Sequence, residues 1–300
     1  MSVQHFLTLD DLSAAQLNEL IDRAIELKAE TKRGAIFEPL KNKSLAMIFS
    51  KSSTRTRVSF EVGMRQLGGS SINLNPNDTQ IGRGEPIEDT ARVISSMVDG
   101  VMIRTDLHSK ITRFADYSSV PVINGLTDDF HPCQLLADIQ TFKEQRGDIA
   151  GSTIAWVGDG NNVCHSFMNA ARIFGFKLKI ATPVGFEPSE IISKQNQAAI
   201  ELCNDPKAVC ENADAIVTDT WASMGQEDEK SEREAAFAGY CVDDALMSLA
   251  NKDALFLHCL PAYRGMEVSE SVIEGPQSVV FQEAENRLHA QKALLEYLLR

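Results

Sequence analysis

The segment "SLAMIFSKSSTRTRVSFEVGMRQLGG", residues 44–69, carries the pattern that decides the fold. Its apolar start, Ser44–Phe49, predicts a buried strand, and the stretch Thr54–Leu67 predicts a helix. Ser53 is a good N-cap for that helix, and Gly68–Gly69 is a good stop. A strand that leads through a polar turn into a helix is the building unit of a parallel α/β sheet.

The same alternation of short apolar runs and helix-period stretches continues through most of the chain. The predicted strands are Ser44–Phe49, Val101–Ile103, Val120–Asn124, Thr153–Gly158, Lys177–Ala181, Ala215–Thr218 and Ala254–Leu257. The predicted helices are Ser13–Thr31, Thr54–Leu67, Glu88–Val98, Pro132–Gln145, Val163–Phe174 and Ala284–Leu299. We therefore expect the α/β fold class, with two doubly wound parallel-sheet domains linked by helices and an active site in the cleft between them.

The length of the chain, 300 residues, exceeds what one hydrophobic core usually fills, so two domains are expected. The polar, glycine-containing link "RGDIAGS", Arg146–Ser152, follows a long predicted helix and is the best candidate for the boundary. The expected domains are residues 1–146, completed by the C-terminal helix at about 280–300, and residues 147–279.

Composition and charge argue against several classes of protein. The hydrophobic content of 43% and the charged content of 24% are those of a folded soluble protein. A formal net charge of −13 argues against nucleic acid or an anionic membrane as the main partner. The first residues lack the pattern of a signal peptide, and no apolar run approaches the length that spans a bilayer. Six cysteines without any CxxC pair suit neither a zinc ribbon nor a disulfide framework, so we expect a cytoplasmic, reduced protein.

The turn before the helix Thr54–Leu67 is rich in hydrogen-bond donors. Its hydroxyl and guanidinium groups belong to Ser50, Ser52, Ser53, Thr54, Thr56, Arg55 and Arg57. A helix start presents unpaired N–H groups and a partial positive charge, and guanidinium groups bind phosphate oxygens in pairs. A capped helix with solvated arginines is the alternative, but this density of donors favours a phosphate site. The site is not a Walker A loop, because GxxxxGK[ST] is absent.

Other polar groups also follow the predicted strands, at the edge where ligands of open α/β sheets bind, and together they indicate an enzyme-like cleft. Arg104 ends a buried strand, and its anionic partner is equally well a ligand or a carboxylate such as Asp99 or Asp106. His131 and Gln134 share a helix face and could both donate to one carbonyl oxygen, although a capping histidine is the commoner arrangement.

The C-terminal half offers further candidates with alternatives of their own. Asp219 could bind an amine, and Ser223 with Met224 could close over a substrate, or the segment is an ordinary exit from a strand. Cys259 is either packing or, beside arginines, a thiolate that steers an amine. Its surroundings in the sequence supply too few ligands for zinc, so we expect no metal site. Arg287 lies at the start of the last helix, where the helix dipole favours anions, and a specific anionic partner would explain it.

The turn "GDGNN", Gly158–Asn162, partly resembles a dinucleotide-binding fingerprint. The third glycine of that fingerprint is missing, because Val163 stands there, and no acidic residue follows the next strand to hold a ribose. A nicotinamide-dependent dehydrogenase is therefore not favoured. Asn161 and Asn162 suit recognition of the charged ends of an amino acid, with turn-forming asparagines as the alternative.

Read together, the motifs resemble the aspartate/ornithine carbamoyltransferase family. The motifs are "SSTRTR", "HPCQLLAD", "GDGNN", "DTWASMG", "HCLPAYRG" and "ENRLHAQKA", in that order, and they span nearly the whole chain. "STRTR" marks the family as a whole, whereas "SMG" with "HCLP" is similar to its ornithine branch. The resemblance implies a carbamoyl phosphate-binding N-terminal domain and an ornithine-binding second domain.

The family's functional residues carry over position by position. The resemblance implies that carbamoyl phosphate binds Ser53, Thr54, Arg55, Thr56, Gln80, Arg104, His131, Gln134, Cys259, Leu260 and Arg287. It implies that L-ornithine binds Asn162, Asp219, Ser223 and Met224. The catalytic residues would be Arg55, Arg104, His131, Asp219 and Cys259. Gln80 would act within its own subunit or in a neighbour.

The resemblance also implies the reaction. The δ-amino group of L-ornithine would attack the carbamoyl carbon of carbamoyl phosphate and give L-citrulline and phosphate, in arginine biosynthesis or degradation. No cofactor is expected, and the family's habit implies a homotrimer or a multiple of trimers. Two alternatives remain open: a carbamoyltransferase for another amine, such as putrescine or N-acetylornithine, and a non-enzymatic regulator that binds the same phosphate compound.

Overall fold

The computed structural model describes residues 3–75, 84–221 and 230–300. The chain forms two compact units, Met1–Gln140 with Glu285–Arg300 and Thr141–Ala284. The first division, after Gln140, falls inside the helix Pro132–Arg146. The expected domain boundary at residues 146–152 stays a prediction. Among the described helices, we find none with the length and apolarity needed to span a membrane.

The first unit contains a four-stranded sheet with the order β2-β1-β3-β4, and all its strands are parallel. The strands are β1 (Ser44–Phe49), β2 (Ser70–Leu74), β3 (Gly100–Arg104) and β4 (Val122–Leu126). The register pairs Phe49 with Arg104, so the turn that follows β1 begins beside the end of β3. The strand order thus brings the arginine-rich turn and Arg104 to one edge of the sheet.

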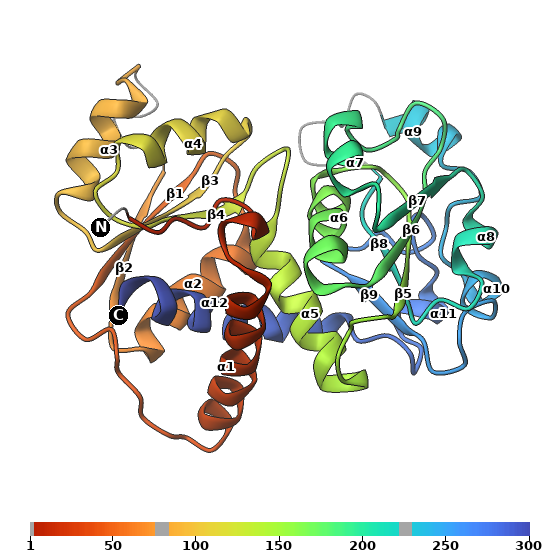
Figure 1. The fold of residues 1–300 in the computed structure, drawn as a ribbon, viewed down its shortest axis with the longest axis horizontal. Helices are drawn as coiled ribbons and strands as arrows, with labels where there is room; N and C mark the ends of the chain where they lie inside the picture. The colour runs from red at the N-terminus through yellow and green to blue at the C-terminus, as the bar shows by residue number, and fades with distance from the viewer. Residues whose placement is uncertain (1–2, 76–83, 222–229) are drawn as a thin grey trace. The chain divides into compact units, whose positions relative to one another are not determined.

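Helices cover both faces of this sheet, with α3 and α4 on one face and α1, α2 and α12 on the other (Figure 1). The helices are η1 (Leu9–Asp11), α1 (Ala14–Lys32), α2 (Thr54–Gln66), α3 (Ile87–Ser95), α4 (His108–Tyr117), α5 (Pro132–Arg146) and α12 (Val280–Leu299). Ile111 and Phe114 of α4 pack against Ile48 and Val101 of the sheet. A Cβ on Gly63 of α2 would make ordinary contacts with side chains of α12, so the two helices lie close together at this point.

The second unit contains a five-stranded parallel sheet with the order β7-β6-β5-β8-β9. The strands are β5 (Thr153–Val157), β6 (Lys177–Ala181), β7 (Ile200–Cys203), β8 (Ala215–Thr218) and β9 (Leu255–His258). The helices are α6 (Asn162–Phe174), α7 (Glu190–Asn196), α8 (Pro206–Cys210), α9 (Lys230–Ala236), α10 (Asp244–Met247) and α11 (Glu270–Ile273). Helices α6 and α7 lie on one face of the sheet, and α8, α10 and α11 lie on the other (Figure 1).

Two parallel-sheet α/β domains confirm the predicted fold class. Three predicted strands, Ser44–Phe49, Lys177–Ala181 and Ala215–Thr218, have the observed bounds. The prediction missed β2 and β7, which are edge strands with partly exposed residues and therefore lack a continuous apolar run. It also missed α4 and the short helices α7 to α11.

Candidate active site

The turn between β1 and α2 forms the expected helix cap. The Ser53 hydroxyl oxygen accepts a hydrogen bond from the Thr56 amide at 3.3 Å and lies 3.1 Å from Thr56 Oγ1. Thr54 is exposed and Arg55 is half-buried at the helix start, where free N–H groups attract anions. Arg57 instead pairs with Glu61 one turn along the helix, at 2.9 Å, on the exposed surface. The two arginines of the motif therefore have different surroundings.

Thr56 is the meeting point of cationic side chains from two other elements. Its hydroxyl oxygen lies 3.4 Å from Arg104 Nη1, at the end of β3, and 3.4 Å from Arg287 Nη2, in α12. Thr56 is 1% exposed and Arg287 is 3% exposed, whereas Arg104 is half-buried. Two guanidiniums around one buried hydroxyl suit a ligand with more than one negative charge.

The carboxylates that could have held Arg104 have other partners. Asp99 accepts hydrogen bonds from Lys43 Nζ at 3.1 Å and from the Ser44 amide at 2.8 Å. Asp106 pairs with Lys110, and this pairing lowers the pKa of the Asp106 carboxyl far below its ordinary value. These two carboxylates are therefore engaged elsewhere, and the ligand interpretation of Arg104 stays a prediction.

His131 lies directly before α5 and is 4% exposed. Burial lowers the pKa of its imidazole well below the ordinary value, and the positive charges of Arg287 and Arg104 lower it further. The ring is therefore neutral at pH 7. A neutral imidazole still has one N–H, which can donate to a carbonyl oxygen without adding a third positive charge to this group.

Gln134 takes a different role from the one expected. Its side-chain oxygen accepts a hydrogen bond from Arg287 Nη1 at 2.7 Å, and its amide nitrogen donates to Asp138 Oδ1 at 2.8 Å. The oxygen, not the nitrogen, therefore faces the arginine. Sequence reasoning missed Asp138, although it ends the motif "HPCQLLAD" one helical turn after Gln134.

In the second unit, the turn "GDGNN" joins β5 to α6. A Cβ on Gly160 would overlap the backbone of Pro188, so close approach of two chain segments requires this glycine. Asn161 caps α6 through its side-chain oxygen, and its amide nitrogen donates to Asp219 Oδ2 at 2.8 Å. Asn162 is half-buried in the first turn of α6. Asn161 thus has a structural role that also orients Asp219.

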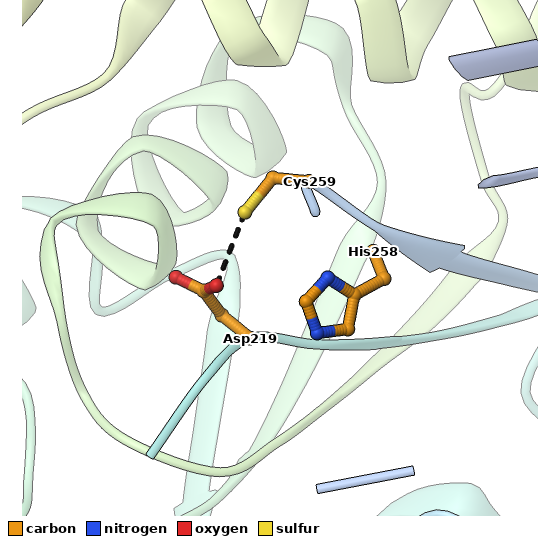
Figure 2. Close-up of side chains that lie close together, drawn as sticks. All are labelled: Asp219, His258 and Cys259. Carbon is orange, nitrogen blue, oxygen red and sulfur yellow. Dashed lines mark hydrogen bonds between the residues drawn. The ribbon is translucent and has the colours of Figure 1, made fainter. Parts of the chain in front are cut away.

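Asp219 and Cys259 lie together because β8 and β9 are neighbours whose register pairs Thr218 with His258. The Cys259 thiol donates a hydrogen bond to Asp219 Oδ1 at 3.1 Å (Figure 2). The expectation of a thiolate beside arginines does not describe this geometry, in which the sulfur is a donor to a carboxylate. Asp219 is 7% exposed, and such a buried carboxylate is suited to hold an ammonium or amine.

A completely buried pair, His258 and Glu267, supports the segment after β9. The Leu260 amide donates to His258 Nδ1 at 2.9 Å, so the other ring nitrogen carries the hydrogen and donates to Glu267 Oε1 at 3.2 Å. Leu260 itself has a positive φ of 56°. Sequence reasoning noted His258 only as a neighbour of Cys259, and nothing in the local pattern pointed to Glu267.

The ligand-type atoms of Asp219, His258 and Cys259 lie within 4.8 Å of one another (Figure 2). The end of β9 supplies His258 and Cys259, and the fold adds Asp219 from the end of the neighbouring strand β8. Both ring nitrogens of His258 have the hydrogen-bond partners described above. A cation bound here would have to displace one of these bonds, so the donor set fits a metal poorly.

Arg233 of α9 is another buried residue that sequence reasoning missed. Its Nη1 lies 2.9 Å from Asp159 Oδ2 and 2.8 Å from the Trp221 carbonyl oxygen, and its guanidinium lies over the Phe186 ring. Asp159 belongs to the "GDGNN" turn. Arg233 therefore ties that turn to the chain just after Asp219.

Three predicted binding residues lie outside the described residues. They are Gln80, Ser223 and Met224. The others fall into two groups, one in each unit. The first consists of Ser53, Thr56, Arg104, His131, Gln134 and Arg287, with the exposed Thr54 and the half-buried Arg55 at the same helix start, and the second consists of Asn162, Asp219, Cys259 and Leu260.

Known protein families match both parts of the chain. The carbamoyl-P binding domain of aspartate/ornithine carbamoyltransferase matches residues 4–144, and the Asp/Orn binding domain matches residues 150–298. An ornithine carbamoyltransferase from Hydrogenovibrio crunogenus is 62% identical, covering 100% of this chain and 99% of that protein. One from Methylococcus capsulatus is also 62% identical, with the same coverage.

Solved structures show the same likeness. Ornithine carbamoyltransferase from Pyrococcus furiosus superposes with a TM-score of 0.95 at 48% identity, covering 99% of this chain and 97% of that one. The enzyme from Burkholderia thailandensis E264 gives 0.93 at 50% identity, covering 99% of both chains. Matches to both domain families, together with full-length identity of this size, establish that this chain belongs to the aspartate/ornithine carbamoyltransferase family.

Proposed function

We propose that this chain is an enzyme that transfers the carbamoyl group of carbamoyl phosphate to the δ-amino group of L-ornithine, giving L-citrulline and phosphate. The observation that carries the proposal is the convergence of Arg104 and Arg287 on Thr56, at the start of a helix that matches the carbamoyl phosphate-binding domain. The ornithine carbamoyltransferases to which the chain is 62% identical over its full length support the choice of acceptor.

The phosphate of the donor binds at the start of α2. Ser53, Thr54 and Thr56 offer hydroxyl groups there, and Arg55 and Arg104 offer guanidinium groups that match phosphate oxygens in pairs. The free N–H groups and the partial positive charge of the helix add to the attraction. Gln80, Cys259 and Leu260 complete the donor site in this proposal.

The carbamoyl group has two ends that need different partners. Its oxygen gains negative charge when the amine attacks, and the neutral His131 donates to it while Arg55 supplies positive charge. Its –NH₂ is a donor and needs an acceptor. Gln134 provides one, because the amide oxygen that faces Arg287 has a second lone pair. Arg287 thereby acts on the carbamoyl group through Gln134.

L-Ornithine binds Asn162, Asp219, Ser223 and Met224 in this proposal. The reacting amine must lose its proton before it attacks, because an ammonium has no lone pair. Asp219 holds the amine end, and Cys259, which already donates to Asp219, steers it. The new C–N bond forms as the C–O bond to phosphate breaks, and the phosphate takes the proton that the amine releases.

The setting of the reaction is also part of the proposal. We place the chain in the cytoplasm, in arginine metabolism, and expect a homotrimer or a multiple of trimers. Light scattering coupled to size-exclusion chromatography measures the mass of the assembly directly. A monomer that retains full activity would contradict this part of the proposal and leave the reaction untouched.

The decisive experiment measures product formation with one donor and several acceptors. Purified protein is supplied with carbamoyl phosphate and L-ornithine, putrescine or N-acetylornithine, and carbamoylated product and phosphate are quantified. We expect turnover with L-ornithine at least 100-fold above the other amines, about 2.7 kcal/mol at 1.36 kcal/mol per tenfold. Preference for another amine would change the acceptor, and donor binding without any turnover would make the protein a regulator.

A further inference from the structure

Asp138 is a buried carboxylate that takes no part in the proposed reaction or in the proposed donor site. It lies one turn after Gln134 in α5 and is 3% exposed. Its Oδ1 accepts the hydrogen bond from the Gln134 amide nitrogen at 2.8 Å. Residues four apart in a helix share a face, so this contact follows directly from the sequence spacing.

The side chain of Gln134 lies between a group that only accepts and a group that only donates. Asp138, when ionised, has no hydrogen to give, and Arg287 has no lone pair to offer. The amide must therefore direct its nitrogen to Asp138 and its oxygen to Arg287, as observed. A flipped amide would place oxygen against carboxylate and N–H against guanidinium, and both buried contacts would become repulsive.

We propose that Asp138 is a positioning residue that fixes the amide of Gln134 with its oxygen toward the carbamoyl group, and so makes the site select carbamoyl phosphate over acyl phosphates that lack an –NH₂. This inference rests on the proposed function. Acetyl phosphate has a methyl group where carbamoyl phosphate has –NH₂, and it keeps the same phosphate. An oriented acceptor separates these two compounds, because only the first can donate to it.

The alternative role for Asp138 is purely structural, as a negative charge near the buried Arg287. The two roles predict different results for Asp138→Asn. Asparagine keeps an oxygen that can accept from the Gln134 amide nitrogen, so the amide stays anchored at both ends without the charge. Asp138→Leu removes both the charge and the acceptor.

The experiment measures three constants for the wild type, Asp138→Asn and Asp138→Leu in the full-length protein. They are the KM for carbamoyl phosphate, the inhibition constant of acetyl phosphate against it, and the inhibition constant of inorganic phosphate. The discrimination ratio divides the second constant by the first, so it does not depend on the fraction of active protein. Inorganic phosphate reports the phosphate contacts separately from the contact made by the –NH₂ group.

We expect Asp138→Leu to lower the discrimination ratio about fivefold, which is the loss of one net hydrogen bond, and to leave phosphate inhibition within about twofold. Asp138→Asn should keep the ratio within about twofold of the wild type. An unchanged ratio in Asp138→Leu overturns the proposal, and so does an equal loss in both variants, which would assign the effect to charge. If Asp138→Leu does not fold, Asp138→Ala takes its place. A fivefold fall of the discrimination ratio in Asp138→Asn is by itself sufficient to reject the proposal.

A wild type that does not use carbamoyl phosphate would instead reject the proposed function.

Discussion

His131 should make the stability of the protein depend on pH in a way that one substitution removes. Burial and the charges of Arg287 and Arg104 hold the pKa of the folded imidazole well below the ordinary 6.5. In the unfolded chain the same imidazole titrates near 6.5. Below that pH the imidazole is protonated in the unfolded state but stays neutral in the folded state, so falling pH favours unfolding.

The size of the effect follows from the difference in bound protons. Between pH 7.5 and pH 5.5 an imidazole with an unfolded pKa of 6.5 that stays neutral when folded should cost about 1.4 kcal/mol of stability. This contribution is fully present above the unfolded pKa and is lost as the pH falls below it. His5 and His108 also have pKa values lowered by burial, but they are present in both proteins and cancel in the comparison.

The assay is urea unfolding of the wild type and of His131→Gln at pH 7.5 and pH 5.5, without ligands and at one protein concentration. Glutamine keeps a donor and an acceptor but does not titrate. The loss of unfolding free energy on acidification should be about 1.4 kcal/mol smaller in the variant. His108→Gln, at a half-buried histidine, is the matched control and should change the loss less. Equal losses in the wild type and His131→Gln would refute a neutral, buried His131.

The remaining predictions concern the two binding groups. Arg55→Ala should lower kcat/KM for carbamoyl phosphate at least 100-fold, about 2.7 kcal/mol. Arg57→Ala is the control and should keep a kcat/KM near that of the wild type, because Arg57 pairs with Glu61. Similar losses of kcat/KM in both variants would contradict the assignment of Arg55 to the phosphate. Cys259→Ala should raise the KM for L-ornithine and shift the pH optimum, and unchanged ornithine kinetics would leave the thiol a packing role. Arg233→Gln and Asp159→Asn should each destabilise the protein by about 3 kcal/mol in urea unfolding, and the double variant should lose less than their sum; strict additivity would show that the pair does not interact.

The features of the site that could be predicted are those formed by residues close together in the sequence. The turn after β1 is formed by the end of a strand, a helix cap and a helix start, and all three could be predicted from residues 44–69. The same holds for the capped start of α6. Local hydrogen bonds decide these features, so local sequence is sufficient to predict them.

The missed residues depend on pairing between distant segments. Glu267 matters because it lies against His258 in a fully buried contact, and Arg233 matters because it meets Asp159. No spacing rule along the chain predicts either contact. Asp138 is the instructive exception, since its spacing from Gln134 was visible, but its meaning required the position of Arg287. The Gln134 amide is oriented by an acceptor on its own helix and by a donor from another element, and only the first of these is visible in the sequence.

Strand order explains why so few residues create both groups. In the first sheet β1 and β3 are neighbours, and the pairing of Phe49 with Arg104 puts the Arg104 guanidinium beside the turn that follows β1. In the second sheet β8 and β9 are neighbours, so the residues just after them, Asp219 and Cys259, come together. Both strands of each pair are parallel, and parallel neighbours end at the same edge. A one-residue shift in either register would turn alternate side chains to the opposite face and separate these groups. The chemistry of each unit therefore depends on backbone pairing as directly as on the residues that perform it.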